Sequence, residues 1–315
     1  MGYGDYIHWS AVIRDLYNYI NSNNINKLND IKKLKCDKYG VQKIKKDNDS
    51  DPFKILIYTN IKNKNYYYNI ECKTIFLNNK YVCKEKYSNI IYFKIISNDY
   101  YNIELKIFLD SEHVVKKYCN NIGLTKFNVS GDIHFTELEI KKVNDLIPNK
   151  DFIFIQPINH KVARSYPFNK FQKIVDYFKN SILFIQDGPA NKFAFQENKL
   201  LSNVLDYTGK LTFRESLLLM KHAKLCILNH GGLSIGAGAV GAKALVIYPG
   251  YFDPKMTEYK TETSIYIHSK DHKSCGWHEY AIHKSDNVKL CDKCIENYNN
   301  FNNDIIINKI KTLIN

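Results

Sequence analysis

Short apolar runs alternate with amphipathic segments through the second half of the chain, and this alternation restricts the fold more than any other feature. The runs 152–156, 182–186 and 244–248 are almost entirely apolar, which is typical of strands buried on both faces of a parallel sheet. The segment 168–178 has the apolar spacing of a helix. Further strands are expected at 204–207 and 224–229, and further helices at 192–202, after Thr212 and over 231–240. Such an alternation predicts a doubly wound α/β domain.

The first half of the chain gives a weaker pattern. Residues 5–20 carry an apolar stripe at helical spacing, formed by Trp9, Val12, Ile13, Leu16 and Ile20. Residues 21–50 are polar and predict a loop with some helix. Strands are expected at 54–59, 74–77 and 90–96, and helices at 111–122 and 304–314. The first half is therefore also predicted to be α/β.

The length favours two domains. A chain of 315 residues is too long for one ordinary hydrophobic core and suits two domains of about 150 residues each. Pro148 marks the expected boundary between them. No run of about eighteen apolar residues is present, and Met1–Asp5 lacks the basic and then apolar layout of a signal peptide. We therefore expect a cytoplasmic protein without a membrane span.

The chain is strongly basic, with a net charge of +13 from 45 Lys and Arg against 32 Asp and Glu. An excess of this size attracts polyanions. The lysines are nevertheless spread through a sequence rich in Lys, Asn, Ile and Tyr, and no DNA-binding or RNA-binding motif accompanies them. We expect a basic surface that attracts phosphorylated substrates, and no nucleic-acid partner.

A glycine-rich segment, residues 229–239, follows a predicted strand and opens a predicted helix. Glycines at this point allow a ligand to approach the backbone closely, and free N–H groups at a helix N-terminus suit a diphosphate. In an open α/β sheet, ligands bind at this edge. The alternative is that the small residues only let the helix pack tightly against the sheet.

The order of the motifs resembles that of the heptosyltransferases, which are family-nine glycosyltransferases that use ADP-heptose. It resembles most the branch that glycosylates autotransporter proteins, whose donor loop contains Gly-Gly-Leu and precedes a small-residue helix, a strand and an aromatic glycine motif. The matching stretches here are Asp206-Tyr207-Thr208-Gly209, His230-Gly231-Gly232-Leu233 and Val246-Ile247-Tyr248-Pro249-Gly250-Tyr251-Phe252. The resemblance covers residues 151–300 and, in the first half, only residues 2–16.

The resemblance implies a GT-B fold, in which two Rossmann-like domains face a cleft. Residues 1–148 would form the acceptor side, residues 149–302 would bind the nucleotide sugar, and a helix over 303–315 would cross back to the first domain. The implied reaction is the inverting transfer of a heptose-like sugar from a nucleotide-diphosphate donor to a hydroxyl of a protein or glycan, without a metal at the reaction centre. A homo-oligomer is compatible with this interpretation.

The resemblance also assigns a donor site. Arg164 takes the place of the family's phosphate-binding lysine, and Lys161 is a second candidate; a guanidinium can bind a phosphate bidentately. Arg164 is alternatively a solvent-facing loop charge. Glu215 is a candidate donor contact and also completes a capping box with Thr212. The donor loop comprises His230, Gly231, Gly232, Leu233 and Ser234.

Two positions of the donor loop depart from the family. His230 replaces an acidic residue, and Ser234 or Ile235 stands where the family has a histidine. Contacts from the glycines and Ser234 to a phosphate remain chemically reasonable. The identity of the donor therefore stays open.

Gly4-Asp5 resembles the family's N-terminal Gly-Asp, whose Asp would be the general base for the acceptor hydroxyl. Asp5 is alternatively only a helix cap. The family has a strand before this motif. Either the first sheet lacks that strand or the start of the chain is missing.

Three of the eight cysteines, Cys275, Cys291 and Cys294, are clustered. A Cys-x-x-Cys pair with a third distant cysteine suits tetrahedral zinc or iron, and the protein-glycosylating heptosyltransferases hold iron at a comparable element. His278 is the fourth ligand that we assign, with His272 and His283 as alternatives. The metal would be structural. The alternative is free thiols on a polar loop.

Two other functions compete with the transferase. A degenerate member of the fold would bind a sugar nucleotide as a scaffold or sensor, which the replacement by His230 and the absent first strand favour. A sugar-nucleotide epimerase of the same fold is the third. Fold alone does not separate the three.

Overall fold

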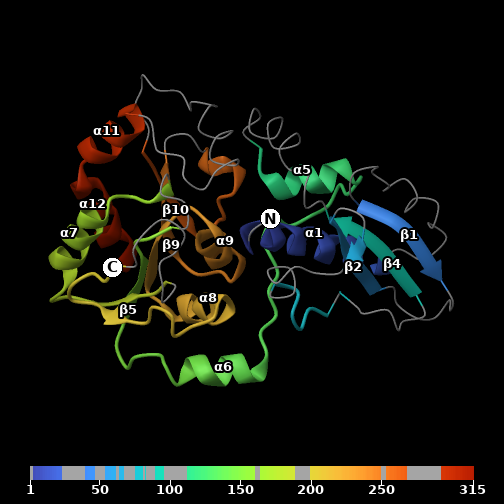
Figure 1. Ribbon diagram of the computed structural model, residues 1–315, viewed down its shortest axis with the longest axis horizontal. Helices are drawn as coiled ribbons and strands as arrows, with labels where there is room; N and C mark the ends of the chain where they lie inside the picture. Colours follow the sequence, from blue (N-terminus) through green and yellow to red (C-terminus); the bar gives the residue numbers. More distant parts are fainter. Residues whose placement is uncertain are drawn as a thin grey trace. The chain divides into compact units, whose positions relative to one another are not determined.

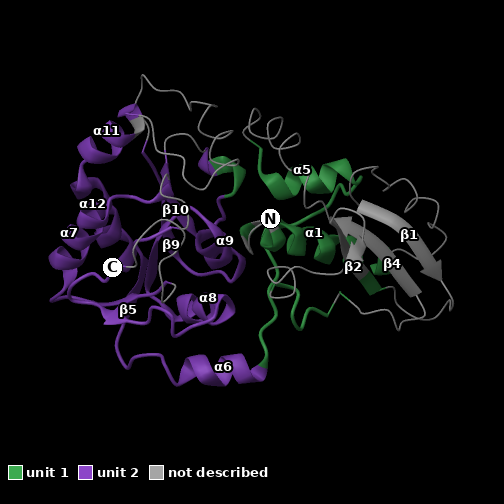
Figure 2. Ribbon diagram, in the orientation of Figure 1, with its two compact units in different colours: residues 1–136, 255–257 green, residues 137–254, 258–315 purple. Residues whose placement is uncertain are grey.

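The computed structural model contains two compact units, which Figure 2 shows in different colours. Unit 1 comprises residues 1–136 and 255–257, and unit 2 comprises residues 137–254 and 258–315. The structure describes residues 3–22, 40–46, 54–61, 64–66, 75–80, 82, 89–95, 112–159, 164–188, 199–249, 253–267 and 292–315.

Unit 2 is built on a parallel sheet, whose described strands number six. They are β5 (Phe152–Gln156), β6 (Leu183–Gln186), β7 (Leu205–Asp206), β8 (Leu225–Asn229), β9 (Ala244–Pro249) and β10 (Glu262–Ile267). Their order across the sheet is β10-β9-β8-β5-β6-β7, and each neighbouring pair is parallel. This is the order of a doubly wound nucleotide-binding sheet, which reverses direction between its first and fourth strands. The predicted α/β class and parallel sheet are confirmed for this half.

Helices cover both faces of this sheet (Figure 1). The described helices of unit 2 are α6 (Glu137–Asn144), α7 (Phe168–Phe178), α8 (Phe213–His222), α9 (Gly232–Ala239), α11 (Asp292–Asn300) and α12 (Asn303–Ile314). A short 3₁₀ turn, η3 (Pro254–Met256), precedes β10. Helices α7 and α12 pack together on one face, and α8 and α9 pack together on the other. The carboxyl edge between the two layers is therefore where a ligand would reach the sheet.

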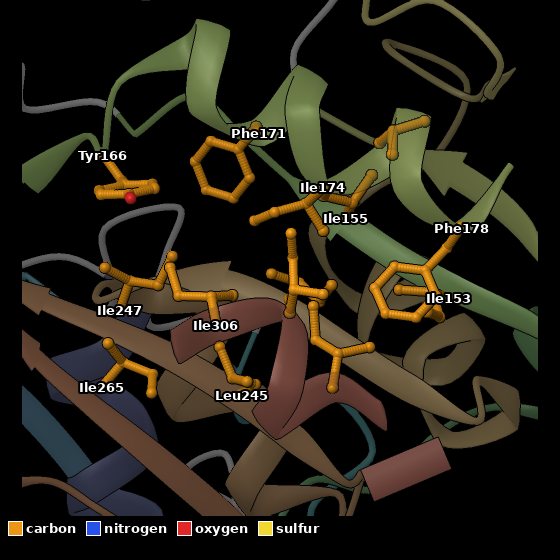
Figure 3. Packing of buried hydrophobic residues seen from close by; sticks show 14 of the residues in the cluster. Ile153, Ile155, Tyr166, Phe171, Ile174, Phe178, Leu245, Ile247, Ile265 and Ile306 are labelled. Atoms are coloured by element: carbon orange, nitrogen blue, oxygen red, sulfur yellow. The ribbon is translucent and has the colours of Figure 1, made fainter. Parts of the chain in front are cut away.

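The core between the sheet and the α7–α12 layer is formed by alternate residues of the strands (Figure 3). Because residues two apart in a strand point to the same face, Ile153 and Ile155 of β5 face the same layer. They belong to one cluster with Phe171 and Ile174 of α7, and Figure 3 shows Ile306 of α12 beside Ile247 of β9. Burying each large aliphatic or aromatic side chain contributes about 1.5–3 kcal/mol. The core fixes the strand ends that carry the site.

The closing helix packs within unit 2. Its apolar residues Ile306, Ile307 and Ile310 are buried in the core of this unit, beside α7. The apolar stripe of α12 therefore covers a face of its own unit's sheet. That residues 303–315 also cross back to the first domain stays a prediction.

Helix α6 belongs to unit 2, so this unit begins at Glu137, before Pro148. Arg214 of α8 donates to both carboxylate oxygens of Glu139, at 2.6 and 2.9 Å. Lys142 forms an ion pair with Glu215 at 2.8 Å. These charge-assisted contacts tie the linking helix to α8.

The described part of unit 1 has a mixed sheet, whereas a Rossmann-like domain was expected. The strands β1 (Gly40–Lys46), β4 (Asn89–Ile95), β2 (Lys54–Ile61) and β3 (Lys64–Tyr66) lie in that order. Among these described strands, the β2–β4 pair is parallel, while β1–β4 and β2–β3 are antiparallel. The described helices of this unit are α1 (Tyr3–Ser22) and α5 (Val114–Asn121).

Helix α1 confirms the predicted helix at the start of the chain. Its stripe from Trp9 to Ile20 is buried, and the Trp9 ring stacks on Tyr118 with centroids 4.3 Å apart. Asp15 accepts a hydrogen bond from the backbone N–H of Asn128 at 2.7 Å, which ties α1 to a distant segment. Among the described helices, none has an apolar stretch of the length that a bilayer crossing requires.

Three local predictions fail within the described residues. Residues 75–78 form a turn where a strand was expected, and β1 occupies residues expected to be loop with some helix. In the helix expected over 192–202, residues 192–198 lie outside the described residues. Lys199–Ser202 is not helical, because the Leu201 N–H donates to the Gln186 side chain at 2.9 Å instead.

Candidate functional site

The candidate site lies at the carboxyl ends of β5 and β8, the central pair of strands at which the sheet order reverses. Ligands of open α/β sheets bind outside such a switch point. Strand β5 ends at Gln156 and leads into a loop that contains Arg164. Strand β8 ends at Asn229, and α9 begins at Gly232. The predicted glycine loop therefore stands at the switch point.

Asn229 connects the two strand ends. Its side chain is 1% exposed and uses both amide donors, to the carbonyl oxygens of Gln156 at 3.2 Å and Pro157 at 2.9 Å. Its Oδ1 accepts from the backbone N–H of Tyr166 at 2.8 Å. Both N–H donors and the oxygen of this buried amide therefore have hydrogen-bond partners.

Asn159 makes the reciprocal connection. Its Nδ2 donates to the His230 carbonyl oxygen at 2.8 Å, and its backbone N–H donates to Ser165 Oγ at 3.1 Å. A Cβ at Gly231 would lie 2.7 Å from Asn159 Nδ2, which is closer than such atoms approach. A side chain at 231 would therefore force the Asn159 amide to shift.

The first amides of α9 supply the anion-binding groups. The Gly231 N–H donates to Ser234 Oγ at 3.0 Å, and this hydroxyl donates back to the Gly231 carbonyl at 2.9 Å. Neither Gly231 N–H nor Ser234 Oγ is thus available to a ligand without breaking a bond. Gly232 and Leu233 are partly exposed, and no described residue accepts from their N–H groups. The helix N-terminus also favours negative charge.

Arg164 lies in the loop after β5, two positions before the anchored Tyr166, and is partly buried. The structure therefore places it on the segment that Asn229 ties to the start of the glycine loop. Lys161, the second candidate for the phosphate contact, lies outside the described residues.

The side chain of His230 points into the protein. The residue is 2% exposed, and its ring stacks on Tyr248 of β9 with centroids 4.6 Å apart and planes at 23°. Tyr248 in turn hydrogen-bonds Glu262. Burial raises the pKa of Glu262 to about 7, against the lowering effect of hydrogen bonds from Tyr248 and Ser264. His230 thus contributes its backbone to the loop while its ring joins a buried cluster.

The Glu215 side chain caps its own helix, α8. Its carboxylate accepts from the Thr212 N–H at 2.8 Å, while Thr212 Oγ1 accepts from the Glu215 N–H at 3.3 Å, so the predicted capping box is confirmed. Lys142 holds the same carboxylate. Burial raises the pKa of Glu215, but hydrogen bonds from Lys142 and Thr212 outweigh it and leave the pKa lowered.

Three polar residues at this edge were not among the predicted site residues. Asn229 and Asn159 are the first two, and Asp187 at the end of β6 is the third. The Ser216 hydroxyl donates to the Asp187 carboxylate, and burial raises the pKa of this carboxyl to about 6. For Asn229 and Asp187 the available signal was a polar residue at the end of a buried apolar run, because such a residue must find a partner.

The side chains of the remaining candidates lie outside the described residues. Asp5 belongs to unit 1, in the first turn of α1, and its side chain lies outside the described residues. Cys275, His278 and Cys291 also lie outside them, and Cys294 is placed only as a backbone position of α11. Within the described residues, no group of three His, Cys, Asp or Glu side chains could hold a metal. The metal site therefore stays a prediction.

Comparisons with known proteins find likeness only among solved structures. No protein-family model matches the sequence, and no curated protein is significantly similar to it. A family 9 glycosyl transferase from Veillonella parvula is 17% identical with a TM-score of 0.47, over 65% of this chain and 61% of that protein. The ADP-heptose lipopolysaccharide heptosyltransferase II of E. coli is 11% identical with a TM-score of 0.46, over 64% and 62%.

A third solved structure is the iron-containing dodecameric glycosyltransferase TibC from enterotoxigenic E. coli. It is 16% identical with a TM-score of 0.48, over 63% of this chain and 52% of TibC. The matched region thus spans less than two thirds of each of these three proteins.

Proposed function

We propose that unit 2 binds the diphosphate of a nucleotide sugar between the carboxyl ends of β5 and β8, and that the protein is an inverting glycosyltransferase. The observation that carries the proposal is the start of α9 at the switch point. There, the N–H groups of Gly232 and Leu233 have no described acceptor. A diphosphate gains hydrogen bonds and a favourable helix dipole at such a terminus. Arg164, in the facing loop, would bind a second phosphate oxygen.

The proposed chemistry is a single displacement. The acceptor oxygen forms a bond to the anomeric carbon as the bond from that carbon to the diphosphate breaks, and the acceptor proton passes to a carboxylate base. Asp5 is the base that we propose. The departing diphosphate carries the electron pair, and the α9 amides with Arg164 stabilise its charge. Asp5→Asn should abolish transfer and leave donor affinity unchanged; undiminished turnover would reject this role.

The nucleotide is found by thermal shift against ADP-, GDP- and UDP-sugars, because a ligand of the folded state raises its stability. Calorimetry with the stabilising nucleotide diphosphate then compares the wild type with Arg164→Ala. A charge-assisted hydrogen bond contributes about 1.5–3 kcal/mol, so the affinity should fall roughly tenfold to a hundredfold.

The control is Lys224→Ala. Lys224 precedes β8 at the opposite edge of the sheet and forms an exposed ion pair with Asp151 at 3.1 Å. The substitution removes the same charge, so it separates a local contact from the general attraction of a basic protein. Equal losses for Arg164→Ala and Lys224→Ala would contradict a phosphate contact by Arg164.

The sugar and acceptor follow from product analysis. We propose a heptose-like sugar and a hydroxyl acceptor on a protein or glycan. Mass spectrometry of the product identifies both, and an altered sugar nucleotide without an acceptor adduct would instead indicate an epimerase.

The second candidate is a sugar-nucleotide-binding protein without transferase activity. Two features of position 230 favour this function. The family's acidic residue is replaced by His230, and the His230 ring is buried against Tyr248, so this position offers a ligand no side chain. Donor binding without transfer or hydrolysis in any acceptor assay would support this function over the enzyme.

The cysteine cluster is proposed as a structural iron or zinc site with His278 as the fourth ligand. Metal analysis of the purified protein should find about one metal per chain for a single tetrahedral site. Cys291→Ser and Cys294→Ser should both lose it, whereas Cys226→Ser, at a buried position inside β8, should retain it. Retention by both cluster variants would reject the site.

A further inference from the structure

The buried amide of Asn229 holds both ends of the loop that follows β5. Its donors fix the start of that loop through the carbonyls of Gln156 and Pro157, and its Oδ1 fixes the end through the N–H of Tyr166. Gln156, Pro157 and Tyr166 lie 73, 72 and 63 positions away in the sequence. One side chain at the end of β8 therefore holds the first and the last residues of this loop in place.

The same connection runs in the opposite direction through Asn159. This residue of the β5 loop donates to the carbonyl of His230, directly before the glycine pair. Its own backbone N–H meets Ser165 Oγ, beside Arg164. The two loops are thus joined by reciprocal amide contacts.

We propose that Asn229 is a positioning residue that holds Arg164 at a fixed separation from the N-terminus of α9, so that both can bind one pyrophosphate. This inference rests on the proposed function. A diphosphate has its two phosphorus centres at one covalent spacing, so the guanidinium and the α9 amides must match that spacing at the same time. If the loop were not held, its ordering would reduce the affinity.

The proposal specifies the ligand class by its two linked phosphates. A nucleoside monophosphate has one phosphate, which binds either at the α9 N-terminus or at Arg164. Its affinity therefore depends less on the separation of these two groups. Loss of Asn229 should weaken ADP and inorganic pyrophosphate binding roughly tenfold, and AMP binding much less.

The test is a double-mutant cycle on ADP affinity, measured by calorimetry with the full chain. Asn229→Leu removes all three hydrogen bonds. Arg164→Ala is then made in the wild type and in the Asn229→Leu background. If Asn229 acts through Arg164, the second substitution should cost far less in that background than in the wild type. Inorganic pyrophosphate serves as the second probe, because it tests binding at the α9 N-terminus and Arg164 without the nucleoside.

The matched control is Gln186→Met. Gln186 is also a buried amide at a strand end, 1% exposed, and it ties a loop by donating to Lys199 O at 2.7 Å and accepting from Leu201 N. Its strand is β6, outside the β5–β8 pair. We expect this variant to lose stability and to keep its ADP affinity.

A second readout does not depend on ligand binding. In hydrogen exchange without ligand, the Tyr166 N–H should exchange faster in Asn229→Leu than in the wild type, while Asn229→Asp, which keeps the acceptor, should preserve its protection. Asn229→Ala, which also removes all three hydrogen bonds, carries the affinity test should Asn229→Leu not fold. It should weaken ADP binding more than AMP binding, and equal losses would overturn the positioning role.

The outcomes separate the two proposals. Additive effects of Asn229→Leu and Arg164→Ala, or equal losses of ADP and AMP affinity, would overturn the positioning role and leave the proposed function standing. A wild type that binds neither ADP, GDP, UDP nor pyrophosphate would overturn the proposed function and the positioning role with it. Non-additive losses confined to diphosphates would support both.

Discussion

Replacing Gly231 by alanine tests the packing of the site without changing a charge. The backbone at Gly231 is extended, with φ 169° and ψ −161°, so alanine adopts it without strain. The whole cost must then come from the new Cβ, which would lie 2.7 Å from Asn159 Nδ2. Asn159 would have to move and lose its 2.8 Å bond to the His230 carbonyl.

The magnitude follows from that hydrogen bond. Leaving a buried amide and a buried carbonyl unpaired costs about 1–3 kcal/mol. For a domain of this size, about 2 kcal/mol corresponds to a fall in Tm of roughly 4–8 °C. Gly188→Ala is the control, because a Cβ at Gly188 meets nothing within 4 Å. That variant should match the wild type or be slightly more stable.

The assay is urea unfolding followed by circular dichroism. It is carried out in the wild type and in the Asn159→Ala variant, because the comparison tests whether Asn159 causes the loss of stability. In Asn159→Ala the obstructing side chain is absent, so Gly231→Ala should cost almost nothing there. Gly231→Ala that is as stable as Gly188→Ala, or that costs the same in both backgrounds, would refute the explanation from Asn159.

Two further predictions concern charged groups of unit 2. Burial raises the pKa of Glu262 from 4.5 to about 7, so its contribution to stability is complete below pH 4.5 and is lost as the pH rises through 7. Glu262→Gln should therefore reduce the pH dependence of the unfolding free energy over this window. It should also stabilise the protein at pH 8 by about 2 kcal/mol after solvent screening. Urea unfolding across pH 4–8 measures this, and an unchanged slope of the unfolding free energy against pH would contradict it. Glu139→Ala leaves Arg214, 3% exposed, without its carboxylate and should cost about 3 kcal/mol in the same assay. Lys142→Ala removes a partner that is 48% exposed and should cost less than about 1 kcal/mol, so equal losses would count against the burial argument.

The buried strands of unit 2 were predictable because both of their faces are covered. Such strands are continuous apolar runs, as in β5 and β8. The edge strand β10 was missed, because its sequence ETSIYI mixes polar and apolar residues and only part of it is buried. The lysine-rich β1 was missed for a related reason, since its sequence GVQKIKK has no apolar run.

The position of the glycine loop could be predicted from local sequence, but its connections could not. A strand followed by glycines and a small-residue helix is a local pattern. The contacts of Asn229 depend on which strands are neighbours, and the β5–β8 pairing joins residues 72 positions apart, as Ile153 with Leu225. Sequence spacing contains no information about that pairing.

The case of His230 shows why a motif position does not determine a side chain's role. Its place before the glycine pair suggested a ligand contact in place of the family's acid. The loop's backbone geometry instead directs the ring onto Tyr248, and the His230 carbonyl joins the two loops by accepting from Asn159. Because any residue supplies that carbonyl, the loop's path tolerates a change of side chain at 230, whereas a Cβ at 231 would displace the Asn159 amide. The glycine and the two amides, rather than the residue before them, therefore determine the shape of the candidate phosphate site.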